Sequence, residues 1–162
     1  MGTLIVYMSK HGCAEKAARI ISESLADGDV TAVDLKSRAD IDLSRYDTVI
    51  IGGSIYLGSI QKGLRKFCEK NLPELLTKRI GLFICCMNQD EAARKHYEAV
   101  FDEALRTHAA AAGIFGGELD FDQLSLLEKS VLSQAVNITE SVSRFDKSAV
   151  RKFAAKLTRA LG

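Results

Sequence analysis

The sequence predicts a three-layer α/β sandwich, in which helices cover both faces of a five-stranded parallel sheet. Five short apolar runs recur along the chain, and they lack the apolar–polar alternation of a strand with one wet face. Stretches of helical period lie between and after these runs, which is the pattern of an α/β protein. The 162 residues contain one proline and no linker-like segment, so we expect a single domain over residues 1–162.

The strands are predicted where the runs are richest in β-branched and aliphatic residues. They occupy residues 3–8, 30–35, 48–52, 80–86 and 114–119. The turn formers Asp27, Gly28 and Asp29 introduce the second run. Continuous apolar character predicts that each strand is buried on both faces of the sheet.

Helices are predicted where apolar residues recur at helical spacing. They occupy residues 13–25, 61–76, 90–112, 121–136 and 146–161. Pro73 is expected to disturb the end of the second helix. The apolar face of the fourth helix is predicted to consist of Phe121, Leu124, Leu127, Val131 and Ala135.

Composition and charge exclude several functions. The chain is 47% hydrophobic and 27% charged, and its net charge of +1 gives no reason to expect nucleic-acid binding. No apolar stretch approaches the roughly 18 residues of a membrane span, and the first run lacks the length and cationic flank of a signal peptide. The four cysteines form no Cys-x-x-Cys pair, so no metal site is expected. We expect a soluble cytoplasmic protein with reduced thiols.

The C-terminal part of the chain is basic. It carries Arg144, Lys147, Arg151, Lys152, Lys156 and Arg159 against the single acid Asp146. Such a charge run usually marks a solvated helix face. The alternative is a docking face for an acidic partner, or peripheral contact with an anionic membrane.

The segment between the first strand and the first helix predicts a phosphate site. Residues 9–14 read Ser-Lys-His-Gly-Cys-Ala, and at such a turn backbone N–H groups and the positive end of the helix dipole converge. Ser9 offers a hydroxyl, Lys10 and His11 offer cations, and Gly12 lets a ligand approach the backbone. The segment is neither a Walker A loop nor a Gly-x-Gly-x-x-Gly loop. The alternative is an ordinary connection in which Ser9 caps the helix.

The segment after the third strand predicts contact with a flat ring system. Residues 52–59 read Gly-Gly-Ser-Ile-Tyr-Leu-Gly-Ser, which places aromatic and aliphatic side chains in a loop that would otherwise be exposed. Stacking on a planar ligand removes both surfaces from water. The alternative is that Tyr56 folds back onto the core.

A third segment, residues 86–90, is expected to meet the other two, because ligands of such sheets bind beyond the carboxyl ends of the strands. Cys85 and Cys86 are adjacent in a strand and should point to opposite faces, so packing is expected rather than a disulfide. Cys13 begins a helix beside two cations. It is interpreted either as a thiol with a lowered pKa and a catalytic role, or as a small packing residue.

Together these segments resemble the flavodoxin-domain family. The similarity rests on the opening segment through Lys16, on Tyr-Asp-Thr-Val-Ile-Ile-Gly at residues 46–52, and on Gly-Ser-Ile-Tyr-Leu-Gly at residues 53–58. The second loop is the most specific part, and it is similar to the branch that contains menaquinone-dependent protoporphyrinogen oxidase. The resemblance implies the flavodoxin-like strand order 2-1-3-4-5 and non-covalently bound FMN, which carries the redox chemistry.

Carried over by position, the resemblance implies a cofactor site built from all three loops, with no catalytic side chain. Ser9, Lys10, His11, Gly12, Cys13 and Ala14 would face the phosphate, and Ser54, Ile55, Tyr56, Leu57, Gly58, Cys86, Met87 and Asn88 would lie along the isoalloxazine ring. Ala14 stands where the family usually has a phosphate-binding Thr or Ser. Residues 121–136 are shorter and less aromatic than the corresponding stretch of the oxidase.

The implied function is that of an FMN-binding redox protein, and one form of it would be an enzyme that oxidises protoporphyrinogen with a quinone acceptor. The alternatives are a flavodoxin-type electron carrier without its own substrate and a flavodoxin-shaped interaction module that has lost the flavin. The expected partner is a redox protein or a small-molecule or quinone acceptor, with no nucleic acid.

Overall fold

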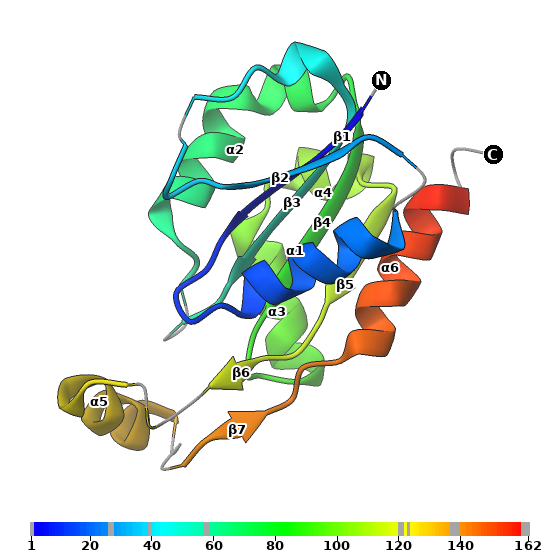
Figure 1. Ribbon diagram of the computed structural model, residues 1–162. Coiled ribbons are helices and arrows are strands. Elements are labelled where there is room, and N and C mark those ends of the chain that lie inside the picture. Colours follow the sequence, from blue (N-terminus) through cyan, green and yellow to red (C-terminus); the bar gives the residue numbers. More distant parts are fainter. Residues whose placement is uncertain are drawn as a thin grey trace.

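The three-layer sandwich and its parallel five-stranded sheet are confirmed in the computed structural model of the chain (Figure 1), which describes residues 2–25, 28–38, 40–56, 59–119, 122, 124–136 and 140–159. The strands of the sheet are β1 (Gly2–Met8), β2 (Val30–Asp34), β3 (Tyr46–Ser54), β4 (Arg79–Cys85) and β5 (Ala111–Ile114). They lie in the expected order β2-β1-β3-β4-β5, and every neighbouring pair is parallel.

The helices divide between the two faces of the sheet (Figure 1). One face is covered by α1 (Cys13–Ser24) and α6 (Lys147–Arg159), and the other by α2 (Lys62–Leu75), α3 (Asp90–Val100) and α4 (Glu103–His108). A short 3-10 turn, Leu43–Arg45, precedes β3. Pro73 lies inside the last turn of α2, which continues to Leu75. Among the described residues, no helix combines the length and the apolar character that a membrane crossing requires.

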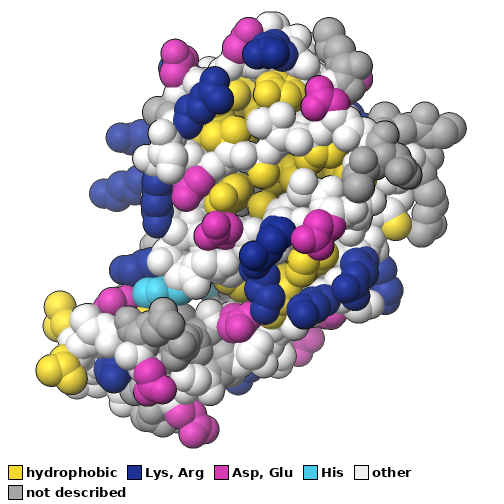
Figure 2. Space-filling view, viewed as in Figure 1, with side chains coloured by type: hydrophobic (Ala, Val, Ile, Leu, Met, Phe, Trp, Pro, Cys, Tyr) yellow, Lys and Arg dark blue, Asp and Glu magenta, His cyan; other side chains and the backbone are white. Residues whose placement is uncertain are grey.

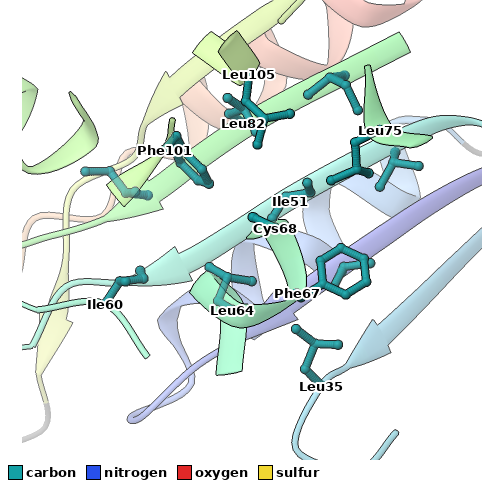
Figure 3. Close-up of a cluster of buried hydrophobic side chains, with 14 of the residues drawn as sticks. Leu35, Ile51, Ile60, Leu64, Phe67, Cys68, Leu75, Leu82, Phe101 and Leu105 are labelled. Atoms are coloured by element: carbon teal, nitrogen blue, oxygen red, sulfur yellow. The ribbon is translucent and has the colours of Figure 1, made fainter. Parts of the chain in front are cut away.

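Neighbouring residues of the central strands feed two separate cores. In β3, Val49 and Ile51 pack toward α2, α3 and α4, whereas Ile50 packs toward α1 and α6. Figure 3 shows the first of these cores, in which Ile51 lies among leucines of α2 and α4. Cys86 belongs to this core and Cys85 to the other, and both thiols are free, which confirms that the adjacent cysteines pack on opposite faces. Burial on both sides explains why the strands read as continuous apolar runs.

Three phenylalanines form the centre of the second core. The ring centroids of Phe83 and Phe115 are 5.1 Å apart, and the Phe153 ring of α6 meets them edge-on at 6.1 and 5.4 Å. Gly52 lies beside Phe83, and a Cβ atom there would come within 2.0 Å of the ring. The prediction that Gly52 and Gly53 open the second loop is therefore wrong: both belong to β3, and Gly52 makes room for the aromatic ring.

The predicted helix over residues 90–112 is wrong, because the chain breaks it in two places. Phe101 adopts an extended conformation and buries its ring, and the Asp102 carboxylate then caps α4 by accepting from the Ala104 N–H at 2.8 Å. Beyond α4, the Ala110 N–H donates to the Ile80 carbonyl at 2.7 Å, next to β4. Pairing with β4 therefore overrides the helical propensity of the alanine-rich segment, and β5 begins at Ala111.

The predicted fifth strand over residues 114–119 is also divided. Beyond β5, the chain leaves the sheet and forms β6 (Glu118–Leu119), which pairs antiparallel with β7 (Val142–Ser143). This two-stranded ribbon carries α5 (Leu126–Val136) at its far end, outside the sandwich (Figure 1).

The predicted apolar face of the fourth helix is wrong in part. Leu127 is 75% exposed and Leu126 is 85% exposed, whereas Leu124 and Leu132 are buried. Phe121 and the side chain of Ala135 lie outside the described residues. The helix also begins later than predicted, at Leu126, so Leu124 precedes it. Because α5 packs on loops instead of on the sheet, its described residues form no broad apolar face.

We predict that Phe83→Ala lowers the free energy of unfolding by about 3–5 kcal/mol, because the change opens a cavity between two other rings. Leu127→Ala should change it by no more than about 0.5 kcal/mol, because the side chain is exposed. Urea unfolding of both variants measures the difference. A loss for Leu127→Ala as large as that for Phe83→Ala would place Leu127 in a core.

Candidate functional site

The three predicted loops meet at one edge of the sheet. Met8, the last residue of β1, is level with Gly53 of β3, and Ser54 is level with Cys85 at the end of β4. Since the strands are parallel, the segments that leave them emerge side by side at the carboxyl edge. The register of the sheet thus places the described residues of the three loops together, namely residues 9–14, 54–56 with 59, and 86–90.

The first loop turns into α1 through Gly12. This residue has φ of +86°, a left-handed conformation that favours glycine, and the Lys16 N–H donates to its carbonyl at 2.9 Å to begin the helix. A Cβ atom added at Gly12 would meet no atom within 4 Å, so the space in front of the turn is open. Gly12 is the N-cap, without a side-chain hydrogen bond, so the alternative that Ser9 caps the helix is wrong.

Ser9 has an unusual environment for a hydroxyl. The residue is 8% exposed, and its Oγ has no hydrogen-bond partner among the described residues. The Lys36 ammonium, which comes from the segment after β2, donates to the Ser9 carbonyl. A buried and unpartnered hydroxyl therefore lies in the loop that leads into α1, whose first N–H groups lack partners within the helix.

Two residues assigned to the phosphate turn their side chains into the core. Ala14, in the first turn of α1, is fully buried in the core beneath this helix, so it can offer a ligand only its backbone N–H. Cys13 is also buried, and the Cys85 thiol donates a hydrogen bond that lowers the pKa of Cys13. Burial opposes this effect, and Lys16 contributes least. The pKa of Cys85 is raised by the same hydrogen bond. The lowered pKa of Cys13 thus arises mainly from a neighbouring thiol, and not from Lys10 or His11.

The second loop is held by its backbone. The Ile55 N–H donates to the Cys85 carbonyl at 2.7 Å, and Tyr56 and Ser59 exchange two backbone hydrogen bonds of 2.9 and 3.1 Å. The Gln61 side chain brackets Ser54, accepting from its N–H at 3.3 Å and donating to its carbonyl at 3.0 Å. Leu57 and Gly58, also assigned to this loop, lie outside the described residues.

Ser54 repeats the situation of Ser9. It is 8% exposed, and its Oγ likewise lacks a hydrogen-bond partner in the part of the chain that the structure describes. Two buried hydroxyls, Ser9 in the first loop and Ser54 at the end of β3, can therefore form hydrogen bonds with a polar ligand.

Tyr56 does not fold back into either core of the sandwich. The Lys10 ammonium lies 4.1 Å from its ring centroid, and the His11 ring lies 5.3 Å away at a tilt of 60°. Its hydroxyl donates to Glu128 Oε2 at 3.0 Å. Burial, followed by this carboxylate, raises the pKa of Tyr56 to about 12. The first and second loops are thus joined through the ring of Tyr56.

The third loop contributes backbone groups and the Met87 side chain to this edge of the sheet. Cys86 is buried in the core that faces α2, and burial raises its pKa to about 11. Its thiol donates to the Asn88 carbonyl of the same loop at 3.5 Å. Its N–H donates to the Gly116 carbonyl at 3.1 Å. Met87 is half-buried, and the Arg144 guanidinium donates to its carbonyl at 2.8 Å. Asn88 is exposed.

Glu128 is the site residue that sequence analysis missed. Its Oε2 lies 3.2 Å from His11 Nε2 and 3.9 Å from Lys10 Nζ, and it accepts the Tyr56 hydroxyl. These contacts, the Tyr56 hydrogen bond first among them, lower the pKa of the carboxyl. One signal was present: Leu124, Glu128 and Leu132 are four residues apart, which puts an acid between two leucines on one side of a helix.

Close approach of the ribbon to the loops depends on glycine. Gly116 has φ of +74°, and a Cβ atom there would lie 1.9 Å from the Arg144 carbonyl oxygen. The available sequence signal was the pair of adjacent glycines, Gly116 and Gly117, inside the predicted strand over residues 114–119. Glycine at this position therefore allows the chain to leave the sheet beside the third loop.

Comparison with known proteins identifies the architecture. The chain matches the family described as the flavodoxin domain over residues 4–146. It is similar to a solved short-chain flavodoxin associated with a bacterial microcompartment, with 19% identity, complete coverage of both chains and a TM-score of 0.64. The flavodoxin of Streptococcus pneumonia TIGR4 is 18% identical, with 99% of each chain covered and a TM-score of 0.60.

A Fusobacterium nucleatum flavodoxin bound to flavin mononucleotide is 12% identical, again with 99% of each chain covered, and has a TM-score of 0.52. At these identities the structural likeness shows the fold. No curated protein sequence matches the chain.

We predict that the Cys13 thiol ionises below its ordinary pKa of 9.0, and that Cys85→Ala raises this pKa, because burial then dominates. The pH dependence of Cys13 alkylation, followed by mass spectrometry, measures the midpoint. Cys68→Ala is the matched control, since Cys68 packs on the other face of the sheet. An unchanged midpoint in Cys85→Ala would show that the thiol–thiol hydrogen bond does not control Cys13.

Proposed function

This chain belongs to the flavodoxin domain family, and on that basis we propose that it binds FMN at the three loops and works as an electron carrier. The observation that supports the proposal most directly is the buried, unpartnered Ser9 hydroxyl. Leaving such a group without a hydrogen bond costs about 1–3 kcal/mol. Its position at a helix end that attracts anions favours a ligand that completes the bond.

The first loop would hold the phosphate. Ser9 Oγ and the N–H groups at the start of α1 are donors, and the left-handed turn at Gly12 leaves the approach open. Lys10 and His11 bring cationic side chains to the same place. Ala14 can take part through its N–H, so the missing Thr or Ser hydroxyl is offset by the hydroxyl of Ser9.

The second and third loops would flank the ring. Ser54 Oγ offers a second unpartnered hydroxyl, and Tyr56 and Met87 offer apolar surface. When bound, FMN supplies the electron-transfer chemistry. The residues of the chain bind it, orient it between the loops and exclude water from one side of it. This division of work requires no catalytic acid, base or nucleophile.

A carrier is favoured over an enzyme with its own substrate. Solved structures that match the chain along nearly their whole length include several flavodoxins, whereas the similar rubredoxin oxygen:oxidoreductase matches over only 37% of its own length. These comparisons give no support to the protoporphyrinogen oxidase branch that the second loop resembles. The partner of a carrier is a redox protein. Four exposed basic residues of α6 (Lys147, Arg151, Lys152 and Lys156) suit an acidic one, and Figure 2 shows lysine and arginine side chains over this helix. We place the protein in the cytoplasm, where its four free thiols stay reduced.

A second candidate is a flavodoxin-shaped interaction module that binds no flavin. The observation in its favour is that Glu128 already pairs with His11 and approaches Lys10. In such a module these contacts would be permanent, and the three loops would serve only to join α5 to the sandwich.

We predict that flavin-free protein binds FMN more tightly than riboflavin, and that Ser9→Ala weakens FMN binding by a factor of ten or more. A hydrogen bond to a charged group contributes about 1.5–3 kcal/mol, which is the basis of this expectation. Riboflavin lacks the phosphate, so its affinity should not change. Quenching of flavin fluorescence during titration measures both affinities.

Ser24→Ala is the matched control, because Ser24 lies at the other end of α1, where its hydroxyl bonds the Ile20 carbonyl. Failure of the unmodified protein to bind FMN would favour the interaction module. Equal losses of FMN and riboflavin affinity in Ser9→Ala would remove Ser9 from the phosphate site.

A further inference from the structure

The helix α5 covers the site that we assign to the cofactor. Glu128 contacts three residues of the first two loops, namely Lys10, His11 and Tyr56. Two buried leucines, Leu132 of α5 and Leu124 just before the helix, pack with Tyr56 and Met87. Figure 2 shows α5 as a lobe set against the body of the molecule at this end of the sheet. Its contacts therefore fall on residues from all three loops.

The carboxylate of Glu128 occupies the position beside Lys10 and His11 that a bound phosphate would occupy. A phosphate ester carries about −1.5 to −2 charges at neutral pH, and the cations available to it on the first loop are the Lys10 and His11 side chains. The Glu128 carboxylate lies within 4 Å of the Lys10 ammonium and of the His11 imidazole. A phosphate that binds them must therefore displace the carboxylate or lie beside a like charge, which is unfavourable.

The leucines cover the apolar part of the site in the same way. Tyr56 and Met87 are the side chains expected to flank the ring, and both are packed against Leu124 and Leu132. This contact is small, since Leu126 and Leu127 of the same helix remain 85% and 75% exposed. A helix held by so few apolar contacts separates from its neighbours at a low cost in free energy.

The base of the ribbon, by contrast, is firmly attached. Lys16 of α1 pairs with Glu118 of β6 at 2.8 Å. Arg144 donates from its backbone to the Gly117 carbonyl at 2.7 Å and from its guanidinium to the Met87 carbonyl at 2.8 Å. The attachment of the ribbon does not involve Glu128, so α5 can leave the loops while β6 and β7 stay in place.

We propose that α5 is a lid over the cofactor site, closed by Glu128, and that this carboxylate competes with the phosphate of the ligand for Lys10 and His11. This inference rests on the proposed function, because the competing ligand is FMN. The lid is closed in this structure, and binding of the phosphate requires Glu128 to leave Lys10 and His11. Glu128 thus sets how tightly and how fast the site takes up a phosphorylated ligand.

We predict that Glu128→Gln tightens FMN binding about tenfold and raises its association rate, because the amide has the same shape but no charge to attract the two cations. Tyr56→Phe, which removes the hydroxyl donated to Glu128 and keeps the ring, should act in the same direction with a smaller effect. Glu74→Gln is the matched control: it makes the same change of charge at an exposed residue near the end of α2, just before β4 begins at the opposite edge of the sheet. Stopped-flow fluorescence and equilibrium titration measure these changes.

Hydrogen exchange of the α5 amides in flavin-free protein tests the closure without any ligand. Exchange should be faster in Glu128→Gln than in the unmodified protein and unchanged in Glu74→Gln. Equal exchange rates would overturn the lid. If the unmodified protein binds FMN but Glu128→Gln binds it equally or more weakly, the competition is overturned while the proposed function stands. If no variant binds FMN, the proposed function itself fails, and the competition fails with it.

Discussion

The parallel register of β1, β3 and β4 is the constraint on which the rest of the structure depends. Because these strands are buried on both faces, a slip of one residue would exchange the side chains of the two cores. The glycine at position 52 and the ring of Phe83 lock β3 to β4, since a larger residue would meet the ring. The same register brings Met8 level with Gly53 and Ser54 level with Cys85. The position of the three loops is therefore a consequence of core packing.

Polar groups at this edge of the sheet are held in place before any ligand binds. Gln61 fixes the backbone of Ser54, and Lys36 is held at the carbonyl of Ser9. The two serine hydroxyls have no comparable partner among the described residues. A rigid backbone with unsatisfied buried hydroxyls is a state that a protein tolerates where a ligand compensates for it. Lys10 and His11 differ from these serines, because the Glu128 carboxylate of the same chain already lies beside their side chains.

Much of the site followed from local sequence, and the rest did not. Ser9, Gly12 and Tyr56 were recognised because their neighbours in the chain define a strand end, a turn and a loop. Their surroundings depend on long-range contacts: the hydrogen bond from Tyr56 joins residues 72 positions apart. For the same reason, sequence periodicity placed Leu127 in a core where the structure leaves it exposed. The buried leucines of this region pack against residues of the loops, Tyr56 and Met87. Loops do not repeat regularly as a sheet does, so a helical sequence pattern cannot show which residues they bury.

The sequence by itself determined the fold class, the strand order expected from the family resemblance and the turn at Gly12 that leads into α1, because continuous apolar runs and a glycine-containing turn act locally. The tertiary structure alone decided that the chain enters a strand at Ala111, that Cys13, Ala14 and Cys86 are buried in the cores, and that Glu128 faces the site. In each case, the deciding partner is distant in the chain. A neighbouring strand, a facing core or an opposite charge can outweigh a local preference of a fraction of a kcal/mol per residue, and only the folded chain brings that partner into contact.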